Sequence, residues 1–384
     1  MIYLDNAATS YPKPPSVVDA VAASLRADAG SPGRGVHAGA RRVSAAIEQA
    51  RAEVAAFIGA PDAARVAFTA GATDSLNGAI AGMLAVAPGA VVVTPLEHAS
   101  VMRPLRAAQA RGLCTEIRLA PLDAARRLDI DRFRAMLDDD VRLAIVSHVS
   151  NVIGVAHDVS AAAAACRERG VPLLVDATQS VGVLDLDAAR FDLLAFSGHK
   201  NLCGPGGVGV LHVGEGVALP PWRVGGTGGF ASDRLTHPVE LPWRYEAGTP
   251  NASGIAGLAA GLAFVRERGL ARVRQHHFNL TRRLLSQLVI LEPHLEVLEA
   301  APDIALVSFR LRGWSPVDVA RVLDESFGIA VGAGLSCAPD AHAFLGTLPD
   351  GAVRASAGLL STEADVDALG SALTEMAAME VYTS

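Results

Sequence analysis

Lys200 stands in Ser197-Gly198-His199-Lys200, directly after an apolar run of the kind that forms a buried strand. A lysine placed there lies at the carboxyl edge of a parallel sheet, where open α/β folds bind ligands. Most lysines are solvated surface residues, and position alone leaves that alternative open. A lysine kept away from water can instead use its amine as a nucleophile in Schiff-base chemistry.

Asp176 ends a second apolar run, in Val175-Asp176-Ala177-Thr178-Gln179. A carboxylate at this position could simply cap the turn that follows. It could also pair with a protonated pyridine nitrogen, which makes pyridoxal an electron sink. Because neighbouring parallel strands end at the same sheet edge, we expect Asp176 and Lys200 to face one flat cofactor.

Two further segments leave predicted strands at the same edge. Thr69-Ala70-Gly71-Ala72-Thr73 leads into a helix, whose first amides and threonine hydroxyl could bind a phosphate. The alternative for Thr73 is an ordinary helix N-cap. His98 also follows a strand, and a lone histidine is more often structural than catalytic. Its place at this edge favours stacking on a flat ring.

The elements that would position these residues alternate along the first part of the chain. Strands are predicted at residues 65–69, 90–95, 115–119, 142–147, 171–177, 192–197 and 207–213. Helices are predicted at residues 73–86, 99–111, 131–139 and 160–169, with loops at 204–207 and 220–229. This alternation predicts an α/β fold with a mainly parallel central sheet and helices on both faces.

The pattern changes after about Asn251. Helices are predicted at residues 254–268, 270–291, 317–326 and 363–378, and strands at 295–299 and 304–310. This part of the chain is predicted to be a smaller α+β domain.

Composition excludes several classes of protein. The 384 residues are 51% hydrophobic and 19% charged with a net charge of −7, and no basic stripe suggests nucleic-acid binding. No apolar run is long enough to span a membrane, and the first residues do not resemble a signal peptide, so we expect a cytoplasmic protein. None of the four cysteines has metal-ligand spacing, and no metal site is predicted.

Taken together, these segments resemble the class V aminotransferase family of fold type I pyridoxal enzymes, and most closely the cysteine desulfurase and selenocysteine lyase group. The resembling segments are residues 3–9, 71–77, 97–98, 148–154, 176–180, 197–200, 244–251, 337–339 and 353–356. They follow the family order over nearly the whole chain. The resemblance implies a large cofactor-binding domain at residues 15–252 and a small domain at 1–14 and 253–384.

The resemblance also implies roles for individual residues. Lys200 binds pyridoxal 5′-phosphate covalently and later moves protons, while Asp176 holds the ring nitrogen. His98 stacks on the ring and helps in acid–base chemistry, and Gln179 contacts the phenolic oxygen. The residues implied for phosphate binding are Ala72, Thr73, Ser197 and His199, with Thr249 from the second subunit of a homodimer.

Asn151 and Arg354 are implied to hold the substrate carboxylate, which suits a guanidinium fork. Cys337 is implied to attack the sulfur of L-cysteine and carry it as a persulfide, from which a protein acceptor could take it. We expect it on a Gly-rich, mobile loop at residues 331–339. The family's compact-loop members have an Arg-Thr-Gly run where this chain has Gly332-Ala333-Gly334, which removes a positive charge near the thiol.

Two alternatives stay open from the sequence. One is a different pyridoxal reaction on the same scaffold, such as transamination, racemisation, β-elimination or selenocysteine cleavage, in which Cys337 is incidental. The other is a non-catalytic scaffold for sulfur transfer. A nicotinamide dehydrogenase is excluded because no Gly-x-Gly-x-x-Gly run follows the first strand.

Overall fold

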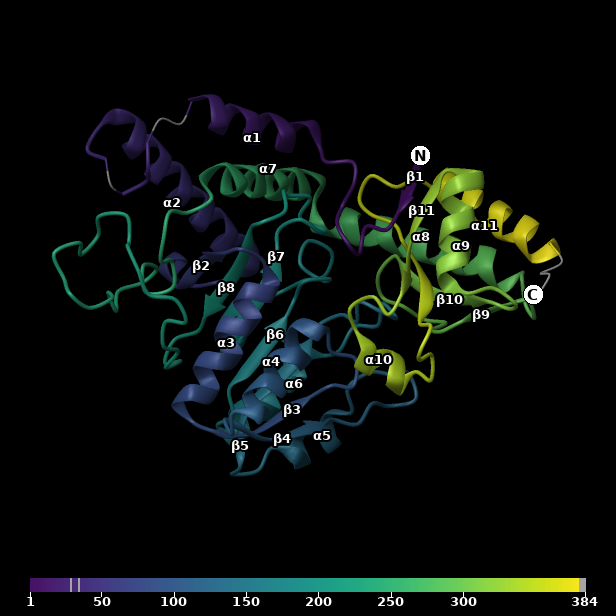
Figure 1. Ribbon diagram of the computed structural model, residues 1–384, viewed down its shortest axis with the longest axis horizontal. Helices are drawn as coiled ribbons and strands as arrows, with labels where there is room; N and C mark the ends of the chain where they lie inside the picture. The colour runs from purple at the N-terminus through teal and green to yellow at the C-terminus, as the bar shows by residue number, and fades with distance from the viewer. Residues whose placement is uncertain (28–29, 34, 380–384) are drawn as a thin grey trace.

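A computed structural model describes residues 1–27, 30–33 and 35–379 of the chain, and it contains two β-sheets. The larger sheet has seven strands and lies among helices, whereas the smaller five-stranded sheet is formed near the two chain ends (Figure 1).

The seven-stranded sheet has the order β2-β8-β7-β6-β5-β3-β4. Its strands are β2 (Val66–Thr69), β3 (Gly89–Val93), β4 (Cys114–Leu119), β5 (Val141–Ser147), β6 (Leu173–Asp176), β7 (Leu193–Ser197) and β8 (Gly209–Val213). Only β8 runs antiparallel to its neighbours β2 and β7. The strands β2, β3, β5, β6 and β7 therefore end at one common edge of the sheet.

Helices pack on both faces of this sheet, as the alternating pattern predicts. They are α2 (Ala38–Ile58), α3 (Ala72–Val86), α4 (Ala99–Ala110), α5 (Ile130–Met136), α6 (Val159–Arg169) and α7 (Ala252–Arg268), and α1 (Pro15–Ala27) packs on α7 (Figure 1). Local residues define several of their ends. Asp158 caps α6 through the Ala161 amide, and Gly170 ends the same helix in the left-handed conformation.

Two apolar cores hold the large sheet between its helices. Residues such as Val92, Val146 and Val175 point into one core, and their strand neighbours Val91 and Ile145 point into the other. Because side chains alternate across a strand, a strand buried on both faces is apolar at every position. This is the physical reason for the continuous apolar runs in the sequence.

The five-stranded sheet has the order β1-β11-β12-β10-β9 and combines the two ends of the chain. It contains β1 (Ile2–Leu4), β9 (Leu295–Val297), β10 (Leu306–Leu311), β11 (Ile329–Gly334) and β12 (Ala352–Ser356). It packs with α8 (Leu270–Val289), α9 (Pro316–Phe327) and α11 (Glu363–Ala378). The short helix α10 (Pro339–Phe344) contacts α4. The strand β1 pairs in parallel with β11, across more than three hundred positions of sequence.

The expected loop at residues 331–339 is wrong for most of its length. Residues 331–334 belong to β11, where Gly332, Ala333 and Gly334 pair with β12. Residues 339–344 form α10, so only a four-residue turn remains between strand and helix. Tertiary pairing overrides the low strand propensity of glycine here. The sequence patterns also did not predict α1, α2, β1 and β12.

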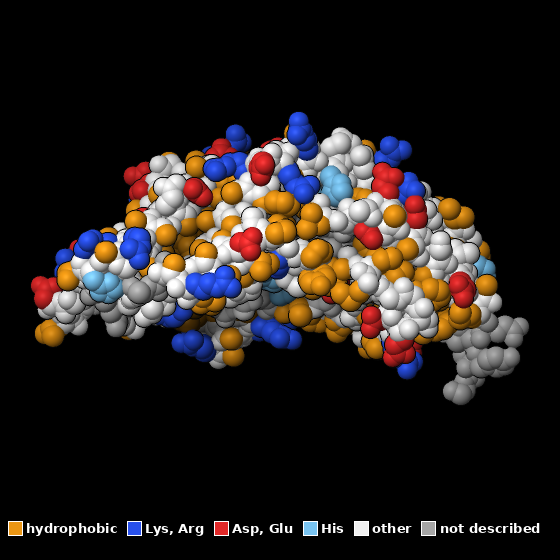
Figure 2. Space-filling view, turned by 90° about the horizontal axis from the view of Figure 1, so that it is seen from above, with side chains coloured by type: hydrophobic (Ala, Val, Ile, Leu, Met, Phe, Trp, Pro, Cys, Tyr) orange, Lys and Arg blue, Asp and Glu red, His pale blue; other side chains and the backbone are white. Residues whose placement is uncertain are grey.

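The face that carries α1 is not dominated by charge of one sign. Figure 2 shows Lys and Arg mixed with Asp and Glu, with hydrophobic side chains between them. Within the described residues, no helix combines the length and the hydropathy required to cross a bilayer.

Candidate active site

The predicted site residues gather around one cavity of about 560 Å³ at the carboxyl edge of the large sheet. Every residue predicted from the sequence lines this cavity except Thr249. The lining includes Ala72, Thr73, His98, Asn151, Asp176, Gln179, Ser197, His199, Lys200, Cys337 and Arg354. Residues from five strand ends of the large sheet therefore meet residues from β11 and β12 of the small sheet.

Lys200 follows β7 and lines the cavity at its centre. Burial lowers the pKa of its ammonium to about 8, and the positive charge of Arg354 acts in the same direction. The negative charges of Asp176, Cys337 and Asp5 oppose this shift. A lysine with this pKa has a substantial neutral fraction near neutral pH, which is what a nucleophilic amine requires.

Asp176 ends β6, and one of its carboxylate oxygens is bound by the turn that follows. Its Oδ1 accepts hydrogen bonds from the Thr178 amide, at 2.9 Å, and from the Thr178 hydroxyl. No residue of the described chain donates a hydrogen bond to Oδ2. The turn-capping alternative is thus correct for one oxygen, and the other is free to pair with a ring nitrogen.

The start of α3 forms a pocket for an anion. The helix begins at Ala72, so its N-cap is Gly71 (φ +152°) and not Thr73, and Gly71 provides no capping side chain. The Ala72 amide donates to the Ser197 hydroxyl at 2.8 Å. The next amides of the first turn have no side-chain cap, and a helix N-terminus of this kind favours a phosphate.

His98 is the N-cap of α4 and also lines the cavity. Its Nδ1 accepts a hydrogen bond of 3.0 Å from the Ser100 amide, so a neutral ring carries its proton on Nε2. Burial lowers the pKa of His98. The Ser100 hydroxyl lies 2.8 Å from the Thr73 hydroxyl and connects the histidine to the start of α3. His98 therefore has both the structural role and the cavity position considered above.

Arg354 in β12 is buried, and its guanidinium is held from two sides. Nη1 donates to the backbone carbonyl of Asn151 at 3.0 Å, and Nη2 lies 3.1 Å from Oδ1 of Asp5. Its Nε finds no hydrogen-bond partner among the described residues. Part of a fork that suits a carboxylate therefore remains unpaired at the cavity wall.

Cys337 is the exposed cysteine of the four, and it lies in the turn between β11 and α10. The turn is anchored: the Ala99 amide donates to the Cys337 carbonyl at 2.8 Å, and Asn151 Nδ2 donates to the Ser336 carbonyl at 2.7 Å. The other cysteines, Cys114, Cys166 and Cys203, are buried, and burial raises the pKa of each thiol. Their burial is typical of cysteines that act as small apolar residues.

His199 and Gln179 bind the N-terminal segment as well as lining the cavity. His199 Nδ1 lies 3.0 Å from the Thr9 hydroxyl, and Gln179 Nε2 donates to the Ala7 carbonyl at 3.0 Å. Burial lowers the pKa of His199 to about 4, with a further contribution from the charge of Lys200. His199 is therefore neutral at physiological pH and would contact a phosphate as a hydrogen-bond donor.

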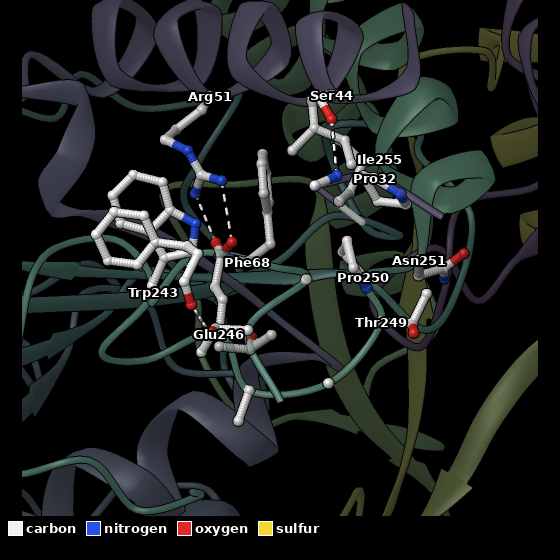
Figure 3. Close-up of a pocket in the computed structure, with 18 of the residues that line it drawn as sticks. Pro32, Ser44, Arg51, Phe68, Trp243, Glu246, Thr249, Pro250, Asn251 and Ile255 are labelled. Carbon is white, nitrogen blue, oxygen red and sulfur yellow. Dashed lines mark hydrogen bonds and ion pairs between the residues drawn. The ribbon is translucent and has the colours of Figure 1, made fainter. Parts of the chain in front are cut away.

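Thr249 lines a second pocket of about 680 Å³ (Figure 3), which Thr69 and Ala70 before α3 also line. Glu246 crosses this pocket and forms an ion pair with the buried Arg51 at 2.5 Å. The rings of Phe230 and Trp243 stack at 3.8 Å and form an apolar wall. In this chain, Thr249 is thus separate from the other predicted site residues.

The sequence interpretation missed two polar residues: Asp5 lines the cavity, and Glu97 does not line it but directly precedes His98. Asp5 pairs with Arg354, and Glu97 is fully buried beside His98. Burial raises the pKa of Glu97 to about 7, although the hydroxyl groups of Ser147 and Thr94 bind its oxygens. An acidic residue next to a candidate histidine at a strand end was the available signal for Glu97. For Asp5, which directly follows β1, the strand pattern gave no such signal, because only the small sheet, in which β11 lies between β1 and β12, brings it to Arg354.

No group of three or more His, Cys, Asp or Glu side chains within residues 1–27, 30–33 and 35–379 is placed to hold a metal ion.

Comparison with known proteins gives the class of protein that this fold and cavity define. A family model described as aminotransferase class-V matches residues 2–369. The chain belongs to this family, which has the type I fold and contains pyridoxal-phosphate-dependent enzymes.

Individual relatives are similar over nearly the whole chain. A cysteine desulfurase of Salmonella choleraesuis (strain SC-B67) is 33% identical, over 98% of this chain and 93% of the relative. One of Yersinia pestis (strain Pestoides F) is 34% identical, over 96% and 91%.

Solved structures agree with these relatives. The apo cysteine desulfurase of Thermococcus onnurineus NA1 matches with a TM-score of 0.89 at 32% identity, covering 98% of this chain and 94% of that chain. The cysteine desulfurase CsdA of Escherichia coli, in an S-sulfonic acid form, matches with a TM-score of 0.86 at 31% identity, with the same coverage of 98% and 94%.

The cavity fits pyridoxal phosphate on its own geometry. It offers an amine at Lys200 with a lowered pKa, a free carboxylate oxygen at Asp176 and a helix N-terminus without a side-chain cap at Gly71. These are the three groups needed for the aldehyde, the ring nitrogen and the phosphate of the cofactor.

Proposed function

We propose that this protein is a pyridoxal-phosphate-dependent cysteine desulfurase that converts L-cysteine to L-alanine and takes the sulfur as a persulfide on Cys337. One observation carries the proposal: an exposed cysteine lines the same cavity as Lys200, Asp176 and Arg354. The relatives that are named cysteine desulfurases support it.

In this proposal Lys200, Asp176, His98 and Gln179 hold the cofactor ring, while the start of α3 with Ala72, Thr73, Ser197 and His199 holds the phosphate. Bound there, the cofactor would supply an electron sink for the pair left when a proton leaves the substrate α-carbon. Lys200 is suited to remove that proton because burial lowers its pKa to about 8.

The remaining residues would place the substrate and accept its sulfur. Arg354, with Asn151, would bind the carboxylate through the unpaired part of its guanidinium. The Cys337 thiolate would attack the substrate sulfur. A sulfur–sulfur bond forms as the carbon–sulfur bond breaks, and the electron pair of that bond stays on carbon, which takes up a proton to give alanine.

We also propose a homodimer in which Thr249 completes the phosphate site of the second subunit. Thr249 lies outside the Lys200 cavity of its own chain, in a pocket with an apolar wall. The same segment exposes Val224, Leu235 and Val239, and exposed apolar side chains of this kind are typical of protein interfaces. The proposal also includes a large domain at 15–252 and a small domain at 1–14 with 253–384. It further includes a cytoplasmic location and a protein sulfur acceptor.

The test is an assay of sulfide and alanine together, with L-cysteine, a reductant and purified holoenzyme. We expect equal amounts of both products from the native protein. Cys337→Ala should lose sulfide release but keep the visible absorbance of the bound cofactor. Cys166→Ala is a matched control, because Cys166 is buried away from the cavity.

Other outcomes would favour the alternatives. Products formed equally well without Cys337 would contradict the persulfide step and favour a different pyridoxal reaction on this scaffold. A purified protein that binds no pyridoxal phosphate would favour a non-catalytic scaffold.

A further inference from the structure

The turn that carries Cys337 has a strained backbone. Ser336 and Cys337 both have φ in the left-handed region, at 47° and 54°, and neither is glycine. A side chain with a Cβ is disfavoured there, and two such residues in succession persist only where their surroundings hold them.

Among the described residues, three hydrogen bonds hold this turn, and one of them is made by a side chain. Ala338 N donates to the Leu335 carbonyl within the turn, and Ala99 N donates to the Cys337 carbonyl, each at 2.8 Å. The third runs from Asn151 Nδ2 to the Ser336 carbonyl at 2.7 Å. The carbonyl between the two strained residues therefore depends on the Asn151 amide.

Asn151 is well placed to hold the turn. It follows β5, its side chain is buried, and its neighbours Ser150 and Val152 are fully buried. Its backbone carbonyl accepts the hydrogen bond from Nη1 of Arg354. One residue thus contacts both the guanidinium at the cavity wall and the turn that carries the thiol.

We propose that Asn151 is a positioning residue for Cys337, and that it fixes the thiol relative to the carboxylate site at Arg354. A side-chain amide has two N–H donors. One of them is used on Ser336, so the other stays free for a substrate carboxylate, and binding the substrate does not require release of the turn. This role goes beyond binding of substrate, and its effect on turnover rests on the proposed function.

The test compares the holoenzymes of Asn151→Ala, Asn151→Asp and Arg354→Lys with the native protein. Asn151→Asp keeps the size of the side chain but replaces the donor with an acceptor. Arg354→Lys is the matched control, because it removes the guanidinium fork but leaves the Asn151 amide in place. The first readout is hydrogen exchange at Ala99 N–H and in residues 335–338, and it does not depend on any enzymatic activity.

We expect both Asn151 variants to exchange at least about tenfold faster at the turn, because one lost hydrogen bond changes an opening equilibrium by roughly that factor. The exchange of β5 and β6 should stay native. In the desulfurase assay, kcat should fall by about 10- to 100-fold through misplacement of the thiol. Arg354→Lys should mainly raise KM and leave exchange at the turn unchanged.

Two results would overturn this role. Native exchange at the turn in both Asn151 variants, with KM raised as in Arg354→Lys, would mean that Asn151 only binds substrate. Faster exchange spread through β5 and β6 would mean a general structural role. If the protein is not a desulfurase, there is no kcat for sulfur release to compare. The exchange result still decides whether Asn151 holds the turn.

Discussion

Asp5 places a negative charge next to the arginine proposed to bind the substrate carboxylate. Its Oδ1 lies 3.1 Å from Nη2 of Arg354, and a Cβ added at Gly332 would come within 2.9 Å of the same oxygen. Glycine at position 332 therefore leaves the room that this carboxylate occupies. The chain therefore lacks the Arg-Thr-Gly run, and at the same place the carboxylate of Asp5 pairs with Arg354.

Asp5→Asn should make the cavity bind carboxylates more tightly. Removing a unit charge a few ångströms from the binding arginine should lower the inhibition constant of propionate, which lacks an amine, by about tenfold. Steady-state inhibition of the holoenzyme measures this constant. Glu363→Gln, which makes the same charge change in an exposed ion pair outside the cavity, should behave like the native protein. Weaker propionate binding in Asp5→Asn would instead mean that Asp5 mainly orients the guanidinium.

At the scale of elements, β8 sets how closely the loop before α3, which we propose binds the phosphate, approaches the sheet. Gly209 begins β8 and pairs with Thr69 of β2 and Ser197 of β7. A Cβ added at Gly209 would lie 2.5 Å from Cα of Gly71, the residue before α3. Contact at that distance requires the backbone to move, so the strand needs glycine here to keep the start of α3 beside Ser197.

Gly209→Ala should weaken binding of pyridoxal phosphate by about tenfold or more, because a displaced helix N-terminus loses its aligned amides. Titration of the apoprotein with the cofactor, followed by visible absorbance, measures the dissociation constant. Gly206→Ala is the matched control, since a Cβ at Gly206 meets nothing within 4 Å. Equal affinity in the two variants would contradict this role for Gly209.

For the whole molecule, buried neutral histidines predict sensitivity to acid. Burial lowers the pKa of His148, His157 and His212 to about 4 and that of His277 to about 3. In the unfolded chain each would have a pKa of about 6.5. Between these values the unfolded chain binds protons that the folded chain does not, so stability falls as the pH falls through this window.

We expect the free energy of unfolding to drop by about 1 kcal/mol per histidine between pH 7.5 and pH 5.5. Urea unfolding at several pH values measures it. His212→Leu should flatten this dependence, because His212 is buried in β8 and neither of its ring nitrogens has a partner among the described residues. An unchanged pH dependence in that variant would show that His212 does not contribute.

The sequence by itself determined the large sheet and most of the cavity. Strands such as β3, and β6 up to Asp176, carry continuous apolar runs because both faces are buried, and this pattern is local and readable. The residues that follow these strands, including Asp176 and Lys200, must then meet at one sheet edge, since parallel strands end together. Their grouping in the cavity followed from this geometry.

Only the tertiary structure decided the rest, because it depends on contacts between distant segments. Gly332, Ala333 and Gly334 have the composition of a loop, yet they form a strand because they pair with β12, while residues 329–331 of the same strand pair with β1. The small sheet also brings Asp5 to Arg354, and the turn that carries Cys337 follows β11 directly. No local pattern in the sequence encodes these contacts, since each joins side chains or strands far apart in the chain.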